Sequence, residues 1–132
     1  MEEIKSNDGS TIAIVIRNDF NKDGYNFVSK EDFPLQLGLN SYKKGDRIKA
    51  HTHFDVPTLI SSFQEIIFMK SGKALAKLYD AKKELLKSVE LSSGDLIFLV
   101  SGGHSFEILE DTKIIEVKQG PYFGKEQDKV VF

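Results

Sequence analysis

Short runs of Ile, Val, Leu, Phe and Tyr alternate with turn-forming clusters along most of the chain. The runs recur about every 8–12 residues, a spacing typical of β-sandwiches and β-barrels. Gly, Asp, Asn and Ser dominate the clusters, because Gly adopts positive φ and the others hydrogen-bond to nearby backbone. The pattern predicts an all-β fold. The expected strands are Thr11–Ile16, Tyr25–Val28, Leu35–Tyr42, Arg47–His53, Phe63–Lys70, Ala74–Tyr79, Leu85–Leu91, Leu96–Val100, Ser105–Leu109, Lys113–Lys118 and Lys129–Phe132.

One stretch, Lys77–Leu91, contains good helix formers and could be read as a short helix. It has no sustained apolar period of 3.6 residues, and Asp80–Lys83 resembles a hairpin turn, so we expect a β-hairpin here. The 132 residues contain no repeat, low-complexity tract or linker. The sequence therefore predicts one domain spanning 1–132.

Composition excludes several classes of protein. The 18 basic and 20 acidic side chains give a net charge of −2, so nucleic acid is not an expected partner. Without cysteine there are no disulfides, and any metal must bind through nitrogen and oxygen. No apolar run approaches the roughly 18 residues that span a bilayer. The acidic, polar first ten residues do not resemble a secretion signal, so we expect a cytoplasmic location.

The three histidines are the candidates for chemistry. His51 and His53 lie two residues apart in an expected strand, so both rings should leave the same face. Glu65 lies in the next strong strand run, and His104 begins a later one. Imidazole and carboxylate groups are ligands that divalent Fe, Mn, Ni, Co and Zn accept. The sequence therefore predicts a metal site.

Two motifs of the chain resemble those of the cupin family. The first consists of Gly45, five residues and His51-Thr52-His53, and is completed by Glu65, six residues and Gly72. The second runs from Gly94-Asp95 to Gly102-Gly103-His104. Between His53 and Glu65 the chain is longer than in most cupins. This leaves open whether Glu65 or Gln64 is the ligand at the position of the motif's glutamate.

The resemblance covers residues 45–108, about half the chain, and implies a fold and a ligand set. The implied fold is a single-domain cupin, a jelly-roll β-barrel also called a double-stranded β-helix. The implied ligands of one divalent ion are His51, His53, Glu65 and His104. Cupins are commonly dimers, so we expect a homodimer.

Further residues could line a pocket for a small-molecule ligand. Arg47 and Lys49 share the parity of His51 and His53, so they could grip an anionic ligand beside the metal, unless strand twist turns Arg47 to solvent. Lys118 and Tyr122 could also reach the pocket, or could belong to a terminal strand that closes the barrel. The apolar segment 54–62 could form a lid or pack against a second subunit.

The expected function is that of a metal-dependent enzyme acting on a small polar molecule, either anionic or derived from a sugar. Isomerisation, epimerisation and oxygen-dependent oxidation are chemistries that suit such a site. Two alternatives stay open, because one fold hosts many functions. The first is a non-catalytic module that binds metal or sugar. The second is a metal-free isomerase in which a histidine acts as general base.

Overall fold

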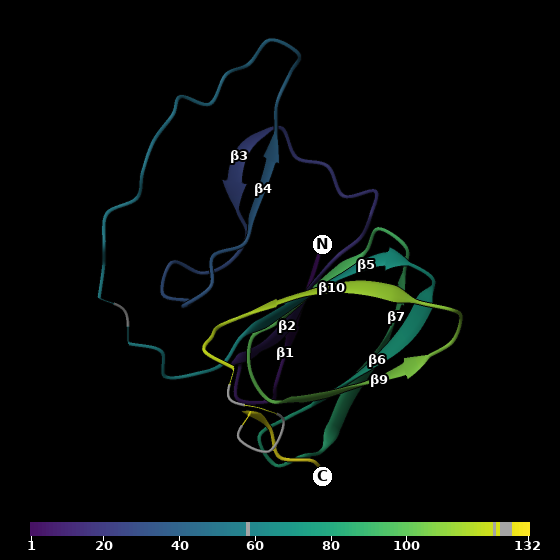
Figure 1. Cartoon of the computed structure of the whole chain (residues 1–132). Helices are drawn as coiled ribbons and strands as arrows, with labels where there is room; N and C mark the ends of the chain where they lie inside the picture. The colour runs from purple at the N-terminus through teal and green to yellow at the C-terminus, as the bar shows by residue number, and fades with distance from the viewer. Residues whose placement is uncertain (58, 123, 125–127) are drawn as a thin grey trace. The chain divides into compact units, whose positions relative to one another are not determined.

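The computed structural model describes residues 1–57, 59–122, 124 and 128–132, and ten β-strands run through them (Figure 1). All strand pairs are antiparallel, which confirms the predicted all-β class. The strands are β1 (Glu2–Lys5), β2 (Thr11–Ile16), β3 (Gly24–Phe27), β4 (Gly38–Ser41), β5 (Glu65–Ser71), β6 (Lys73–Tyr79), β7 (Leu85–Ser92), β8 (Leu96–Leu99), β9 (Gly103–Ile108) and β10 (Lys113–Lys118).

The chain divides into two compact units. One unit comprises residues 1–18 and 63–132, and the other comprises residues 19–62. The first contains a five-stranded sheet, in the order β1-β2-β8-β5-β10, and a three-stranded sheet, in the order β7-β6-β9. The second contains the β3–β4 hairpin. We call the first unit the sandwich unit.

The core of the sandwich unit lies between its two sheets. Alternate residues of each central strand point inward, as the period of two requires. On the five-stranded sheet these include Val15, Ile67 and Ile97, and on the three-stranded sheet they include Ala76 and Leu78. These inward side chains are at most 2% exposed, so burial of apolar surface accounts for the packing of the two sheets.

Several expected strands match the structure. β2 and β10 have the expected bounds, and the β6–β7 hairpin replaces any helix, with the Asp80 N–H donating to the Glu84 carbonyl. In the described residues the strands form separate sheets and not one closed barrel.

Two expected strands are wrong, and one observed strand was not expected. Residues 47–53 and 129–132 contain no strand. The first segment is exposed throughout, with Ile48 66% exposed, so its alternation does not mark a buried face. β1 was missed because only Ile4 of its four residues is buried.

Side chains of the sandwich unit hold the backbone on either side of residues 19–62. Asp95 Oδ1 accepts a hydrogen bond from the Asn18 N–H at 3.0 Å. Gln119 Oε1 accepts one from the Gln64 N–H at 2.7 Å, and both glutamines are buried. These bonds fix the points at which the chain leaves the sandwich unit and returns to it.

Candidate functional site

Glu65 and His104 meet at one end of the sandwich core. Glu65 begins β5 and is the register partner of Leu99, while His104 on β9 is the partner of Leu78. Leu78 and Leu99 are both buried core residues, so the two polar side chains point inward from opposite sheets. His104 Nε2 lies 3.2 Å from Glu65 Oε2, with 34% and 20% of the respective side chains exposed. The structure thus brings together two of the four expected ligands.

The backbone before His104 is shaped by a glycine. Gly102 has a φ of 72°, a left-handed conformation that side chains disfavour. A Cβ at this position would lie 2.2 Å from the Tyr79 carbonyl oxygen. The Ser101 hydroxyl donates to the Thr11 carbonyl at 2.7 Å and fixes the same turn. The glycine of the second motif therefore lets β9 start close to β6, which aims His104 at Glu65.

One acidic and one basic residue of β10, Glu116 and Lys118, lie next to the pair. The hydrogen bond with His104 lowers the pKa of Glu65, although burial acts in the opposite direction. A hydrogen bond with Glu65 raises the pKa of Glu116, and burial adds to that effect. The opposite directions of the two shifts are those expected of neighbouring carboxyl groups, since ionisation of one disfavours ionisation of the other. Lys118 Nζ lies 3.6 Å from Glu116 Oε1.

Lys118 is a basic residue beside the Glu65–His104 pair. It ends β10 directly opposite Glu65. Its Nζ lies 2.7 Å from Asp128 Oδ2 and 4.9 Å from the centre of the Tyr122 ring. The hydrogen bond to Asp128 raises the pKa of Lys118. Of the expected pocket residues, Lys118 therefore lies beside the Glu65–His104 pair, and Tyr122 contacts Lys118.

Two hollows open on these groups. One, of about 210 Å³, is lined by Glu65, His104, Lys118 and Asp128, with Phe63, Gln64, Leu99, Ser101, Gly102 and Lys129. The other, of about 340 Å³, is lined by Glu116, Lys118, Tyr122, Asp128 and Lys129. Lys118, Asp128 and Lys129 border both. The first hollow has room for a small ligand in contact with the carboxylate, imidazole and ammonium groups.

The other two expected ligands belong to residues 19–62. The His51 and His53 rings lie 5.2 Å apart, inclined at 76°. His51 Nδ1 lies 2.9 Å from the Lys49 carbonyl oxygen. Because a carbonyl only accepts, Nδ1 is the donor in this contact, and Nε2 is not used by it. Arg47 and Lys49 are exposed and lie on no strand, so the shared parity on which their role was predicted does not apply.

The structure also distinguishes the roles of Glu65 and Gln64. It is the carboxylate of Glu65 that contacts His104, whereas the backbone of Gln64 bonds to Gln119. Glu116 and Asp128 were not predicted. The parity of Glu116 with Lys118 on one strand could have identified the former, but no local pattern links Asp128 to a strand ten residues earlier.

The apolar segment 54–62 leaves its expected role untested. Residue 58 lies outside the described residues, and Phe54 and Leu59 are 95% and 90% exposed.

No helix in the described part of the chain is long and apolar enough to cross a membrane.

Within each unit, the described residues form no cluster of three or more His, Asp or Glu side chains placed to hold a metal ion. Comparisons with family models, with curated proteins and with solved structures found no match.

Proposed function

We propose that the chain is a metal-dependent enzyme of the cupin type that acts on a small polar molecule, either anionic or derived from a sugar. The observation that carries the proposal is the meeting of Glu65 and His104 across the two sheets, 3.2 Å apart, beside a hollow that also contains Lys118. A carboxylate and an imidazole aimed at one point from two rigid strands form a preorganised half-site for a divalent ion.

The donor atoms of this pair suit such an ion in type and in spacing. Two ligands that each lie about 2.1 Å from one ion are about 3 Å apart when the angle between them is 90°. The 3.2 Å between His104 Nε2 and Glu65 Oε2 is close to that value. Nitrogen and carboxylate oxygen together suit Fe, Mn, Ni, Co or Zn.

In this proposal His51 and His53 are the remaining ligands. Support comes from their spacing before Glu65 in the first motif and from the Lys49 carbonyl, which leaves Nε2 of His51 to bind a metal. In many metal sites a backbone carbonyl that accepts from the other ring nitrogen fixes a histidine ligand in this way. The three neutral imidazoles and one carboxylate would leave positions for water or substrate.

The bound ion would polarise a carbonyl or hydroxyl oxygen and lower the pKa of a bound water. The chain's own residues supply binding and orientation. The Lys118 ammonium attracts the anionic group of the substrate, and a hydrogen bond with Glu116 holds the Glu65 carboxylate in place. The inward walls of the hollow, such as Leu99, limit access of water.

A metal-free isomerase is the second candidate, and the same contact favours it. A carboxylate that accepts from an imidazole orients the ring and stabilises its protonated form, which is the arrangement of a general acid–base pair. In this reading the opposite nitrogen of His104 exchanges the proton with substrate. A binding module without catalysis uses the same hollow and differs only in turnover.

Metal analysis distinguishes these candidates. Purified chain is incubated separately with Fe, Mn, Ni and Zn, desalted and analysed for bound metal. We expect about one ion per chain in the wild type, and a loss in E65Q, H104A, H51A and H53A. E107Q is the matched control, because Glu107 lies on β9 and pairs with Lys77 at the surface. Equal metal contents in the wild type and E65Q would refute the metal proposal.

Turnover assays then separate an enzyme from a binder. The loaded chain is offered sugar phosphates and nucleotide sugars, and oxygen uptake is followed in parallel. Turnover that disappears with the metal supports the enzyme. Turnover that persists without metal and is lost in H104A supports the acid–base isomerase instead.

We also propose a homodimer, formed through apolar side chains that the single chain leaves in solvent. Ile115 and Val117 on the outer face of β10 are about half exposed, and Phe54 is almost wholly exposed. Light scattering measures the mass directly. A monomer at all concentrations would exclude the dimer.

A further inference from the structure

Residues 128–132 contact the strands of the sandwich unit at two places. Asp128 Oδ2 contacts Lys118 Nζ at 2.7 Å. The Phe132 ring packs edge-on against Tyr79, with centroids 5.3 Å apart, and Lys83 Nζ lies 5.1 Å from its centre. A Cβ on Gly103 would lie 2.7 Å from this ring, so the ring occupies space that only glycine leaves open. Phe132 thus anchors the segment independently of the Asp128 contact.

The first of these contacts lies inside the candidate site. Lys118 stands opposite Glu65, and the hollow that contains Glu65 and His104 is bordered by Lys118, Asp128 and Lys129. The side chains of Lys118 and Asp128 are 22% and 12% exposed, so water screens their attraction only in part. The Asp128 carboxylate therefore neutralises the ammonium group of the residue that stands opposite Glu65.

The other charged groups around Lys118 do not replace this contact. Glu116 Oε1 is 3.6 Å away, Glu65 acts on Lys118 at longer range, and the Tyr122 ring faces the ammonium at 4.9 Å. Lys129 follows Asp128 in sequence and is a second basic residue that borders both hollows. Two lysines thus border the hollow, and the negative charge closest to the Lys118 ammonium is the carboxylate of Asp128.

We propose that Lys118 and Lys129 form an anion subsite beside Glu65 and His104, and that Asp128 occupies it in the free protein until a ligand carboxylate or phosphate displaces it. The subsite deepens the proposed function, on which it rests for the identity of the hollow as the ligand site. An internal competitor lowers the apparent affinity by the fraction of chains in which the subsite is vacant. Removing the competitor should therefore strengthen anion binding.

Inorganic phosphate and acetate serve as probes of the subsite. Each is titrated calorimetrically into the metal-free full chain at constant ionic strength, for the wild type, D128N and K118M. D111N and K113M are the matched controls. Both residues are exposed near the opposite end of β10, and the two substitutions change the charge in the same way as D128N and K118M. Binding of acetate as well as phosphate would show that any small anion fits, and binding of phosphate alone would assign the subsite to phosphorylated ligands.

We expect D128N to bind phosphate about fivefold more tightly than the wild type. The reason is that a partly buried ion pair of ordinary strength keeps Asp128 in the subsite in most wild-type chains. K118M should bind at least about tenfold more weakly than K113M, because the principal cation is lost. An affinity of D128N equal to or below that of D111N overturns the proposal. So does an equal affinity of K118M and K113M, which would mean that Lys118 does not contact the anion.

A second measurement requires no variant. In the wild type, phosphate should shift the NMR signals of the Lys118 ammonium and the Asp128 carboxyl group with the same midpoint, since one is bound as the other is released. A Lys118 shift without an Asp128 shift overturns displacement. Because these experiments are done without metal, their failure is distinct from that of the proposed function, which the metal contents of E65Q and H104A decide.

Discussion

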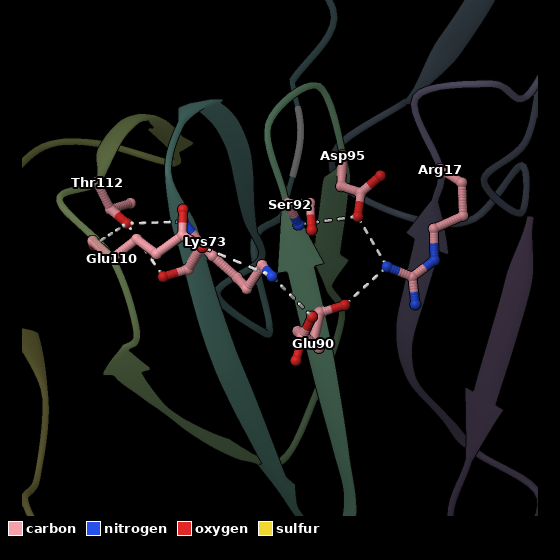
Figure 2. A network of polar contacts seen from close by, with 7 residues as sticks. All are labelled: Arg17, Lys73, Glu90, Ser92, Asp95, Glu110 and Thr112. Carbon is pink, nitrogen blue, oxygen red and sulfur yellow. Dashed lines mark hydrogen bonds and ion pairs between the residues drawn. The ribbon is translucent and has the colours of Figure 1, made fainter.

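Asp95 holds Arg17 with one carboxylate oxygen and the backbone of Asn18 with the other. Oδ2 lies 2.7 Å from Arg17 Nη1 and also accepts from the Ser92 N–H, while Oδ1 accepts from the Asn18 N–H. Arg17 Nη1 additionally donates to the Glu90 carbonyl (Figure 2). The end of β2 is thereby tied to the turn before β8, at the place where the chain leaves the sandwich unit.

Loss of the central residue of this network, Asp95, should destabilise the fold far more than loss of the peripheral Glu90 side chain. The Asp95 side chain is 7% exposed, and removing it would leave two backbone N–H groups without this acceptor and the Arg17 guanidinium without its carboxylate partner. We expect D95A to lower the free energy of unfolding by about 2–3 kcal/mol. Glu90 is 56% exposed and reaches Lys73 at 3.5 Å, so E90A should change it by less than about 0.5 kcal/mol. Urea denaturation of both variants tests the contrast, and equal losses would contradict it.

Asp95 should also contribute to the acid sensitivity of the fold. Burial alone would raise its pKa, but hydrogen bonds from Ser92, Arg17 and Asn18 outweigh burial and hold the pKa below 3.8. A carboxyl group with a lowered folded pKa stabilises the protein above its unfolded pKa, and this contribution disappears as the pH falls through the folded pKa. The stability advantage of wild type over D95N should therefore be constant near neutrality and shrink below about pH 4.

Urea titrations at several pH values measure that difference directly. E90Q serves as the control, and its difference from wild type should stay near zero at every pH because the side chain is largely exposed. An advantage over D95N that does not change between neutral and acid pH would mean that the carboxylate is not the group that titrates.

The fold class could be read from the sequence because apolar alternation records which strand face is buried. The pattern located β2 and β10 to the residue, since the first is buried throughout and turn residues bound the second. It overinterpreted residues 47–53, where Ile48 and the two histidines alternate without a buried face. Alternation predicts a strand only where tertiary contacts use it, and a short polar edge strand such as β1 leaves almost no pattern.

The candidate site was predictable in part for a related reason. The motif glycines and the parity of their strands identified Glu65 and His104, because turn geometry is encoded locally. The Asp128–Lys118 contact joins residues ten apart in sequence, and Asp128 lies on none of the strands that the pattern could have identified. Glu116 and Asp128 acquire their roles from three-dimensional proximity, which only the structure supplies.

The residue behind His104 should matter more for stability than a surface leucine on the neighbouring strand. Leu78 is the register partner of His104 and is 0% exposed. Replacing it with alanine removes buried methyl groups and leaves a cavity, so L78A should lower the free energy of unfolding by about 2–5 kcal/mol. Leu85 is 55% exposed, and L85A should cost less than about 1 kcal/mol. Similar losses in both variants would show that the two sheets do not pack around Leu78.

Gly102 provides a test of how the turn before β9 aims His104. Both Gly102 and Gly9 have positive φ, but a Cβ on Gly9 would meet nothing within 4 Å, whereas one on Gly102 would meet the Tyr79 carbonyl at 2.2 Å. G9A should therefore cost only the conformational strain, about 1 kcal/mol. G102A adds a steric clash with backbone and should cost about 3 kcal/mol or more. Because β9 must move to relieve the clash, His104 should also lose its contact with Glu65, which NMR signals of the imidazole report. Equal stability of G102A and G9A, with the imidazole signals unchanged, would mean that this turn does not fix the position of His104.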